Sequence, residues 1–273
     1  MCQKGTDFLN MERTRFKHPP SISYLLKGWG TVILGLSLYA SCGLETYTYL
    51  YPVNTDTISS DPTIGYYQFK HNTDNDIDEF QGYEIFYKLY AADSSEILSD
   101  RSSLENVYLS TEAPLTGATG GRKFSRLRLK RISDNRLFDT LRPLLEIPSG
   151  QKGTPWVFKF DFSPLLKTPK EPPVLIWYQS DGTTEVARFI LLRSPRVEAK
   201  EEETFVPEQF LEMDPDVTLM NVKSIVQTKG KLSVVFAVAA FGWKLDTTPI
   251  YSNVIFLNRR SGTEDVLTID LSQ

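Results

Sequence analysis

Apolar and polar positions alternate with a period of two along much of the chain after residue 60. The clearest stretch, residues 82–91 (GYEIFYKLYA), places Tyr83 and Tyr87 on one face of a strand and Glu84 and Lys88 on the other. Tyrosine and phenylalanine, which pack well on a pleated sheet, are abundant. The same pattern predicts nine further strands, at residues 64–70, 123–130, 156–162, 174–179, 185–192, 217–224, 232–244, 250–258 and 266–271.

Turns and two short helices separate the expected strands. The pair Asp181-Gly182 between two of them is a strong hairpin signal. Helices are expected at residues 94–107 and 135–141, the second with Asp134 as its N-cap. Because strands and helices do not alternate regularly, a parallel α/β core is not expected. The pattern predicts an all-β fold, an antiparallel β-sandwich.

Polar stretches divide the chain into regions. Residues 61–196 are expected to form a β-sandwich region, and residues 217–273 a C-terminal β region that either completes the same sandwich or builds a second one. Between them, residues 197–216 are acidic, contain two prolines and show little alternation, which is typical of a linker or a long surface loop. The roughly 230 residues after position 42 are enough for one large domain or for two of about 100 residues.

Two stretches are specific enough to resemble a known family. Residues 82–88 (GYEIFYK) look like the third strand of a fibronectin type III domain, whose pattern is Gly-Tyr-x-hydrophobic-x-Tyr-basic. Residues 235–242 (VFAVAAFG) and 249–252 (PIYS) are similar to the last two strands of that family. The resemblance implies an immunoglobulin-like antiparallel sandwich. Either one sandwich carries a long insertion between the matching pieces, or each piece belongs to a sandwich of its own.

The N-terminal segment follows a different pattern. Four basic residues between positions 13 and 27 precede an apolar run at 31–40, which ends in the small residues Ala40 and Ser41 before Cys42. This run is about half as long as a bilayer-spanning helix needs, but it suits the core of a secretory signal peptide. The arrangement resembles a bacterial lipoprotein signal of the spirochaetal type. The resemblance implies that residues 1–41 are cleaved off, that Cys42 receives acyl chains such as palmitate, and that residues 42–60 anchor and tether the mature domain.

Two features of this segment depart from the commoner pattern. Tyr39 stands three positions before Cys42, where bacterial lipoprotein signals usually have Leu. Met11, followed by Glu-Arg-Thr-Arg, makes a more usual start for such a signal than Met1. The alternatives to a cleaved signal are an ordinary buried strand with a buried cysteine and an uncleaved, single-pass N-terminus.

Removal of residues 1–41 makes the protein more acidic. These residues carry five Lys or Arg and two acidic residues, so the formal net charge changes from −4 to −7. Nucleic acid, whose phosphates require a basic surface, is therefore not an expected partner. Cys42 then has no disulfide partner, and acylation would remove its thiol and supply the two chains that stable anchoring requires. The expected location is the bacterial cell envelope, facing the periplasm or the cell surface, and Gly43 after the cysteine favours the outer membrane.

Few residues of the mature chain could support catalysis or metal binding. His71 is its one histidine and Cys42 its one cysteine, so neither a multi-histidine nor a cysteine-based metal site is expected. Asp74, Asp76 and Asp78 alternate like the first ligands of a calcium loop, but the turn glycine and the closing glutamate of such a loop are missing. These aspartates are weak metal candidates, and a solvated acidic turn is the favoured interpretation. No cofactor is expected.

A basic cluster offers a better candidate for binding. Arg126, Arg128 and Lys130 alternate with Leu127 and Leu129, so a strand here places three cations on one face and two leucines on the core face. Such a stripe could bind anionic lipid head groups, at about 1 kcal/mol for each cation near a charged surface, or an acidic protein partner. The alternative is an edge strand whose charges prevent aggregation. The whole cluster comprises Arg122, Lys123, Arg126, Arg128, Lys130, Arg131, Arg136 and Arg142.

The sequence therefore predicts a lipid-anchored protein of the cell envelope that acts as a binding or structural module and is not an enzyme. The alternative is a lipid-anchored hydrolase of envelope polysaccharide. Such an enzyme would use paired carboxylates, and Asp and Glu are frequent enough here to supply them.

Overall fold

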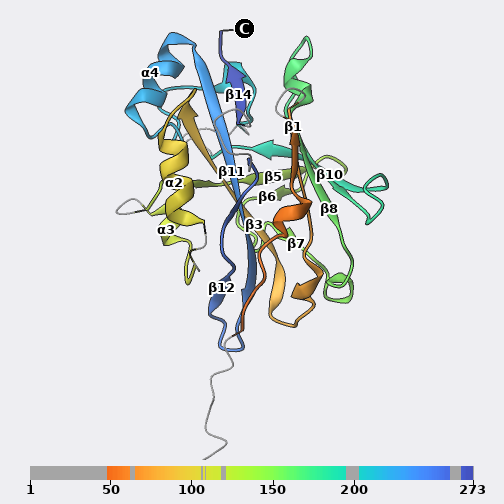
Figure 1. The fold of residues 1–273 in the computed structure, drawn as a ribbon. Helices are drawn as coiled ribbons and strands as arrows, with labels where there is room; N and C mark the ends of the chain where they lie inside the picture. Colours follow the sequence, from red (N-terminus) through yellow and green to blue (C-terminus); the bar gives the residue numbers. More distant parts are fainter. Residues whose placement is uncertain are drawn as a thin grey trace, which may run out of the picture. The chain divides into compact units, whose positions relative to one another are not determined.

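Two antiparallel β-sheets with a few short helices form the unit from Thr48 to Gln273 (Figure 1). The computed structural model describes residues 48–61, 65–105, 107, 109–117, 121–194, 203–258 and 266–272. The predicted signal peptide and Cys42 lie outside the described residues. Among the helices that are described, none has the length and hydropathy needed to cross a membrane.

The first sheet, here called sheet A, has the strand order β1-β2-β8-β9-β10-β5-β6. Every pairing within it is antiparallel. β9 and β10 form the expected hairpin, in which Gly182 adopts a positive φ of 69° and the Asp181 carboxylate accepts hydrogen bonds from the Thr183 and Thr184 backbone amides. The strands are β1 (Ser59–Asp61), β2 (Tyr66–Lys70), β5 (Arg128–Arg131), β6 (Leu137–Phe138), β8 (Val157–Asp161), β9 (Val174–Tyr178) and β10 (Glu185–Leu192).

The second sheet, sheet B, is built around two long antiparallel strands, β3 (Phe80–Ala91) and β11 (Lys231–Trp243). These strands contain two of the stretches that resemble a fibronectin type III domain, and they pair along nearly their whole length, so one sandwich contains both. The shorter strands β4 (Ser125–Arg126) and β7 (Leu145–Glu146) pair with β3, whereas β12 (Pro249–Tyr251), β13 (Ile255–Phe256) and β14 (Leu267–Asp270) pair with β11.

The main core lies between the two sheets and is rich in aromatic rings. Phe236 of β11 contacts Tyr67 of β2 and Phe160 of β8, with ring centroids 6.0 and 5.3 Å apart. Phe69 of β2 contacts Tyr83 of β3 at 5.6 Å. These rings alternate along their strands, so the period-two pattern of the sequence points them into the space between the sheets.

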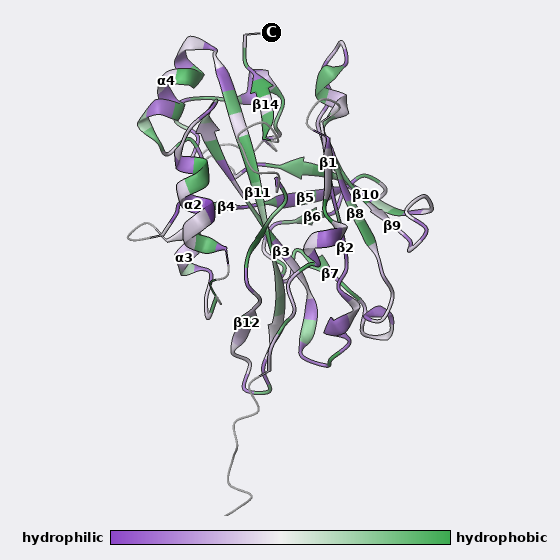
Figure 2. Ribbon diagram, in the orientation of Figure 1, coloured by the Kyte–Doolittle hydropathy of each residue, from purple (hydrophilic) through white to green (hydrophobic). Residues whose placement is uncertain are grey.

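A second core covers the outer face of sheet B. Figure 2 shows hydrophobic residues along most of β11, whose interior positions are all buried. The covering layer includes α2 (Glu96–Leu104) and α3 (Ala113–Thr116), which bury Ile97, Leu104 and Leu115 against Phe86 and Tyr90 of β3. β3 is therefore buried on both faces. Within the described residues, the remaining helix is α4 (Met220–Thr228), and the 3-10 turns are η1 (Thr55–Thr57), η2 (Thr73–Asn75), η3 (Ser149–Gln151), η4 (Ser163–Leu166) and η5 (Pro207–Gln209).

Burial of the outer face places charged side chains of β3 under the helices. Lys88 is 7 % exposed and its Nζ lies 2.5 Å from the Asp100 carboxylate of α2. The Tyr90 hydroxyl donates a hydrogen bond of 2.8 Å to the same carboxylate. A buried charge requires a partner and hydrogen bonds, and Asp100 provides both for Lys88.

Four local predictions were wrong. The stretch at 217–224 is not a strand, because Val222 and Val226 recur at helical spacing and are buried on one side of α4. The stretch at 135–141 is not a helix, because Asn135 takes a left-handed φ of 57° and the chain then forms β6. The expected strand at 250–258 is interrupted between β12 and β13, where Ser252 Oγ accepts a hydrogen bond from the Ala240 backbone amide. The expected strand at 123–130 is divided between the two sheets.

Two segments expected to lie outside the core belong to it. Residues 48–60, predicted as part of a tether, contribute Leu50 and Val53, which are 0 % and 1 % exposed. The described part of the predicted acidic linker, residues 203–216, contributes Phe205 and Phe210 to the core between the sheets. Both segments are therefore part of the folded domain.

Candidate functional site

The predicted stripe of three cations does not form on a single strand. Arg126 belongs to β4 of sheet B, whereas Arg128 and Lys130 belong to β5 of sheet A. Leu127 and Leu129 do point into the core as expected, and both are fully buried. The chain crosses from one sheet to the other at Leu127, whose backbone amide donates to the Ile85 carbonyl of β3.

Arg126 is committed to a buried ion pair. Its Nε lies 2.5 Å from Oε2 of Glu84, a side chain with no exposed surface, and only 15 % of the Arg126 side chain is exposed. The guanidinium also donates to the backbone carbonyls of Asp139 and Leu141. Burial raises the pKa of the Glu84 carboxyl, and the Arg126 charge opposes that rise. Arg126 is thus part of the architecture and has little surface to offer a ligand.

Arg128 is also held within the fold. Its Nη1 donates to the Arg193 carbonyl at 3.2 Å, and its Nη2 lies 3.7 Å from the Asp139 carboxylate. Lys130 lies opposite Ile190 and Leu137 in sheet A. Its side chain is partly exposed, whereas three other members of the cluster, Arg131, Arg136 and Arg142, line a groove.

A groove with a volume of about 380 Å³ lies between sheet A and the segment that carries β7. Arg131, Arg136 and Arg142 line it together with Phe138 and further aromatic and apolar side chains from both sheets. A second hollow of about 490 Å³ shares Arg131, Trp177 and Phe189 with the groove. The two hollows therefore adjoin, and we refer to them together as the arginine groove.

Cation–π contacts hold two of the arginines in the groove. The Arg131 and Arg136 guanidinium carbons lie 5.1 and 5.0 Å from the centroid of the Phe138 ring. Phe138 in turn packs edge-on against Phe189 at 5.7 Å. Stacking on a ring orients a guanidinium for contact with an oxyanion. The Arg131 guanidinium also forms an ion pair with Asp134, whose carboxylate lies 3.3 Å from Nη1.

Two hydrogen-bond donors of the groove are unsatisfied. Arg131 Nε and Trp177 Nε1 are buried and have no acceptor. A buried donor without a partner costs about 1–3 kcal/mol. Neither atom has accessible surface, so these donors do not by themselves mark a position for a ligand.

The third arginine is fixed by neighbours. Arg142 donates from Nη1 to the Tyr251 hydroxyl and from Nη2 to the Glu112 carboxylate, both at 2.6 Å. Burial acts to lower its pKa, but the hydrogen bond to Glu112 and the charge interactions with Tyr251, Glu112 and Glu84 together outweigh that effect, so the pKa is raised. Arg142 contributes a permanent positive charge at one wall of the groove.

Two residues of the predicted acidic turn, in the loop of residues 71–79, have structural roles. Asn75 at the end of η2 is fully buried and exchanges hydrogen bonds with the Tyr51 backbone, at 2.8 and 2.7 Å. His71 hydrogen-bonds the Tyr83 hydroxyl and the Lys152 carbonyl at 2.7 and 2.6 Å. Within the described ranges no three metal-ligating side chains come together, so the candidates Asp74, Asp76 and Asp78 do not converge on a metal position.

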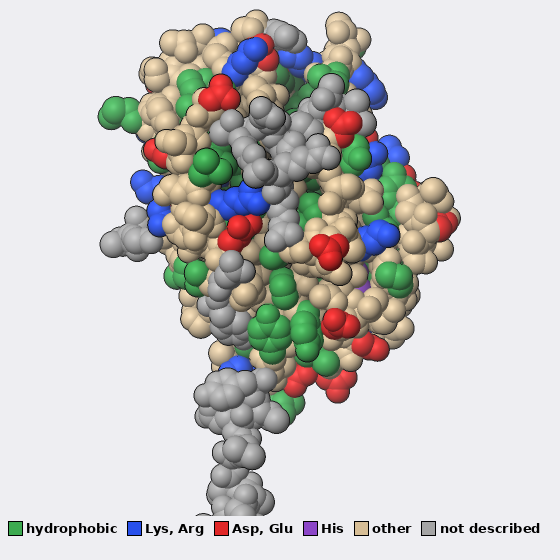
Figure 3. All heavy atoms as spheres, viewed as in Figure 1, with side chains coloured by type: hydrophobic (Ala, Val, Ile, Leu, Met, Phe, Trp, Pro, Cys, Tyr) green, Lys and Arg blue, Asp and Glu red, His purple; other side chains and the backbone are tan. Residues whose placement is uncertain are grey.

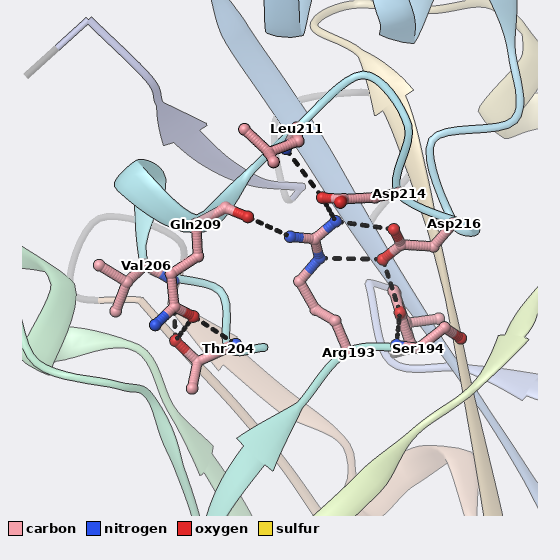
Figure 4. A network of polar contacts seen from close by, with 9 residues as sticks. Arg193, Ser194, Thr204, Val206, Gln209, Leu211, Asp214 and Asp216 are labelled. Atoms are coloured by element: carbon pink, nitrogen blue, oxygen red, sulfur yellow. Dashed lines mark hydrogen bonds and ion pairs between the residues drawn. The ribbon is translucent and has the colours of Figure 1, made fainter. Parts of the chain in front are cut away.

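A buried polar network joins the predicted linker to both sheets (Figure 4). Arg193, directly after β10, has no exposed surface, and its guanidinium lies 2.7 Å from the Asp216 carboxylate and 2.8 Å from that of Asp214. The Tyr87 hydroxyl of β3 donates to Asp216 at 2.6 Å and accepts from the Ser194 amide at 2.7 Å. Both aspartates lie in the segment that the sequence assigned to a linker or surface loop.

The surroundings of this network shift the pKa values of Arg193 and Tyr87. Burial alone would lower the pKa of Arg193, but the Asp216 and Asp214 carboxylates raise it overall. Burial, followed by the Asp216 charge, raises the pKa of Tyr87 well above its usual value. Arg193 therefore stays charged and Tyr87 stays neutral, and the network is a fixed structural element.

The sequence contained weak signals for what was missed. Arg193 follows the fully apolar stretch Phe189–Leu192 directly, and a charge that continues a buried strand needs a buried counter-ion. Phe205 and Phe210 within the acidic stretch indicate packing against a core. Trp177 and Phe189 carry no signal that separates a groove residue from an ordinary core residue.

Comparison of this chain with protein-family models, with curated proteins and with solved structures finds no match.

Proposed function

We propose that this protein is a lipid-anchored binding module of the bacterial cell envelope and that the arginine groove is its binding site. Acylated Cys42 would hold the domain at a membrane, facing the periplasm or the cell surface. The observation that carries the proposal is the pair of arginines, Arg131 and Arg136, stacked on Phe138 at the wall of an open groove.

The strand order of sheet B supports a fibronectin type III-like sandwich. In immunoglobulin-like sandwiches the third strand lies beside the last two. Here β3 pairs with β11, and β11 pairs with β12, which are the strands that carry the resemblance. Sheet A is larger than in such domains and contains most of the insertion between the matching pieces.

The lining of the groove indicates the chemistry of its ligand. Guanidinium groups bind carboxylates through paired, charge-assisted hydrogen bonds. Phe138, Trp177 and Phe189 offer apolar surface beside them. An acidic, aromatic-containing segment of another envelope protein fits both features, and the two adjoining hollows suit an extended segment.

The arrangement of carboxylates favours binding over hydrolysis. A glycosidase needs two carboxylates facing a cleft, one of them free to donate a proton. Four buried carboxylates of the described chain are ion-paired: Glu84, Asp100, Asp214 and Asp216. In the arginine groove, Glu185 is paired with Arg188 at 2.7 Å, and the other lining carboxylate is that of Glu146.

A peptide-binding measurement tests the proposal. A fluorescein-labelled hexapeptide of alternating Glu and Phe is titrated with the protein and followed by anisotropy. The double variant Arg131→Ala, Arg136→Ala should bind at least tenfold more weakly, because each charge-assisted hydrogen bond contributes about 1.5–3 kcal/mol.

Two controls make this test specific. Lys167→Ala, Lys223→Ala changes the net charge equally at two exposed positions outside the groove and should leave the affinity unchanged. A peptide with Lys in place of Glu should not bind. Equal affinity of the wild type and the groove variant, or equal binding of both peptides, would overturn the assignment of the groove.

A further inference from the structure

One end of the domain exposes aromatic and apolar side chains. Trp243 and Leu245 lie at the turn between β11 and β12, where Trp243 is 37 % exposed and Leu245 is fully exposed. Tyr49 and Tyr51 are each 44 % exposed and pack edge-on against each other at 5.1 Å. Figure 3 shows hydrophobic side chains gathered towards this lower end of the domain, with acidic side chains beside them.

Both groups lie against the same loop, residues 71–79. The Tyr51 amide donates to the Asn75 side chain at 2.8 Å, and the Trp243 amide donates to the Glu79 carbonyl at 3.0 Å. The four side chains Tyr49, Tyr51, Trp243 and Leu245 therefore belong to one end of the sandwich, and we call them the aromatic end.

The aromatic end is also where the described chain begins. Thr48 immediately precedes Tyr49, and six residue steps separate it from Cys42. A chain spans at most about 3.6 Å per residue, so the Cα atom of Thr48 cannot lie more than about 22 Å from that of Cys42. If Cys42 carries acyl chains in a bilayer, this end of the domain must stay within that distance of the surface.

We infer that the aromatic end dips into the membrane interface and fixes the orientation of the domain on the bilayer; this inference rests on the proposed acylation of Cys42. Tryptophan and tyrosine prefer the interface, where the ring is buried and its polar atom stays hydrated. Lys244, between Trp243 and Leu245, can extend its ammonium group back to water. The turn thus has an apolar tip with a cation that tolerates shallow burial.

The charges near the aromatic end indicate that its contact with the membrane is apolar and not electrostatic. Asp74, Asp76, Asp78 and Glu79 lie in the adjoining loop, and Asp246 follows Leu245 in the turn. These carboxylates oppose attraction to anionic lipid. The contact is therefore apolar, it occurs on zwitterionic phosphatidylcholine, and it persists when salt is raised, whereas attraction through basic patches weakens with salt.

The opposite end of the domain provides matched controls. Leu166 and Met220 are 72 % and 87 % exposed, as much as or more than the aromatic side chains. Leu166 follows β8 at the end where Asp161 pairs with Tyr66, and Met220 begins the helix before β11. That end lies far along the strands from Trp243, so the same bilayer that meets the aromatic end does not reach it.

Quenching of tryptophan fluorescence by brominated lipid tests the inference. The full-length processed protein is reconstituted in phosphatidylcholine vesicles with brominated acyl chains, and vesicle-bound protein is isolated by flotation. The difference in emission between wild type and Trp243→Phe reports Trp243 alone. We expect this component to be quenched, to recover in Leu245→Ser, and to stay quenched in Met220→Ser.

The outcomes distinguish the two proposals. Protein that floats with the vesicles but shows the same Trp243 emission with brominated and ordinary lipid overturns the membrane contact and leaves the anchor intact. Protein that does not float overturns the anchor and, with it, the contact. Quenching that disappears at high salt would contradict the apolar character of the contact.

Discussion

Arg193 and Asp216, 23 residues apart in the chain, form a two-point ion pair in which neither side chain is more than 1 % exposed. Their atoms meet at 2.9 Å (Nε to Oδ2) and 2.7 Å (Nη2 to Oδ1), and the guanidinium carbon of Arg193 lies 3.8 Å from the centre of the Phe210 ring. This pair, with Asp214 and Tyr87, ties the segment after residue 203 to both sheets.

Removal of the Arg193 charge should strongly destabilise the domain. Arg193→Met leaves two buried carboxylates without a counter-ion, a change that typically costs about 3–5 kcal/mol. The free energy of unfolding from urea titration measures the loss. Arg188→Met, at an exposed position of β10, should change it by less than about 1 kcal/mol. A loss in Arg193→Met no larger than in the control would show that the network does not hold the segment.

Arg126 should act as a structural residue and not as a ligand residue. Arg126→Gln should lower the unfolding free energy by about 3 kcal/mol, because it leaves Glu84 buried without its partner. Adding Glu84→Gln should recover part of the loss, since the buried charge is then removed as well. The double-mutant cycle measures this coupling, and additive losses would contradict the pairing.

Gly82 should not accept a side chain. Its φ of 154° lies outside the range that other residues adopt readily, and a Cβ atom there would overlap the Leu145 carbonyl where β7 joins β3. Gly82→Ala should destabilise the domain by about 1–3 kcal/mol. Gly150→Ala, with no atom near the added carbon, is the control. Similar unfolding midpoints for the two variants would mean that β7 moves aside without cost.

Stability should fall as the pH drops below the unfolded pKa of His71. Burial lowers the pKa of His71 below its usual 6.5, although the Lys152 carbonyl and the Asp76 charge oppose this shift. Between the folded pKa and 6.5 the unfolded chain binds more protons, so the free energy of unfolding rises with pH in that window. His71→Gln should flatten this part of the profile in urea titrations from pH 5 to 7. An unchanged slope would assign the dependence to other groups.

The sheets were the more predictable part of the structure. β10 has the bounds that were expected, and β3 and β11 were located to within two residues at each end. Alternation suffices for these strands because each is long and its apolar face is continuous. α4 has only two and a half turns and few apolar residues, so the spacing of these residues did not distinguish a helix from a strand. A strand was predicted in its place.

The groove was less predictable because it depends on where the chain changes sheets. The basic cluster was recognised, but Arg126, Arg128 and Lys130 were preferred to Arg131 and Arg136. The chain changes sheets at Leu127, so Arg126 lies on sheet B, where it forms a buried ion pair with Glu84 and is not available to a ligand. Contacts of residues far apart in sequence, such as Arg193 with Asp216, follow from the packing of sheets and cannot be derived from local periodicity.

The proposed function depends most on membrane attachment through Cys42. Metabolic labelling with palmitate tests it directly, in cells that produce the wild type or Cys42→Ala at equal levels. We expect label on the wild type and none on the variant. Equal labelling of both, or no label on either, would contradict it.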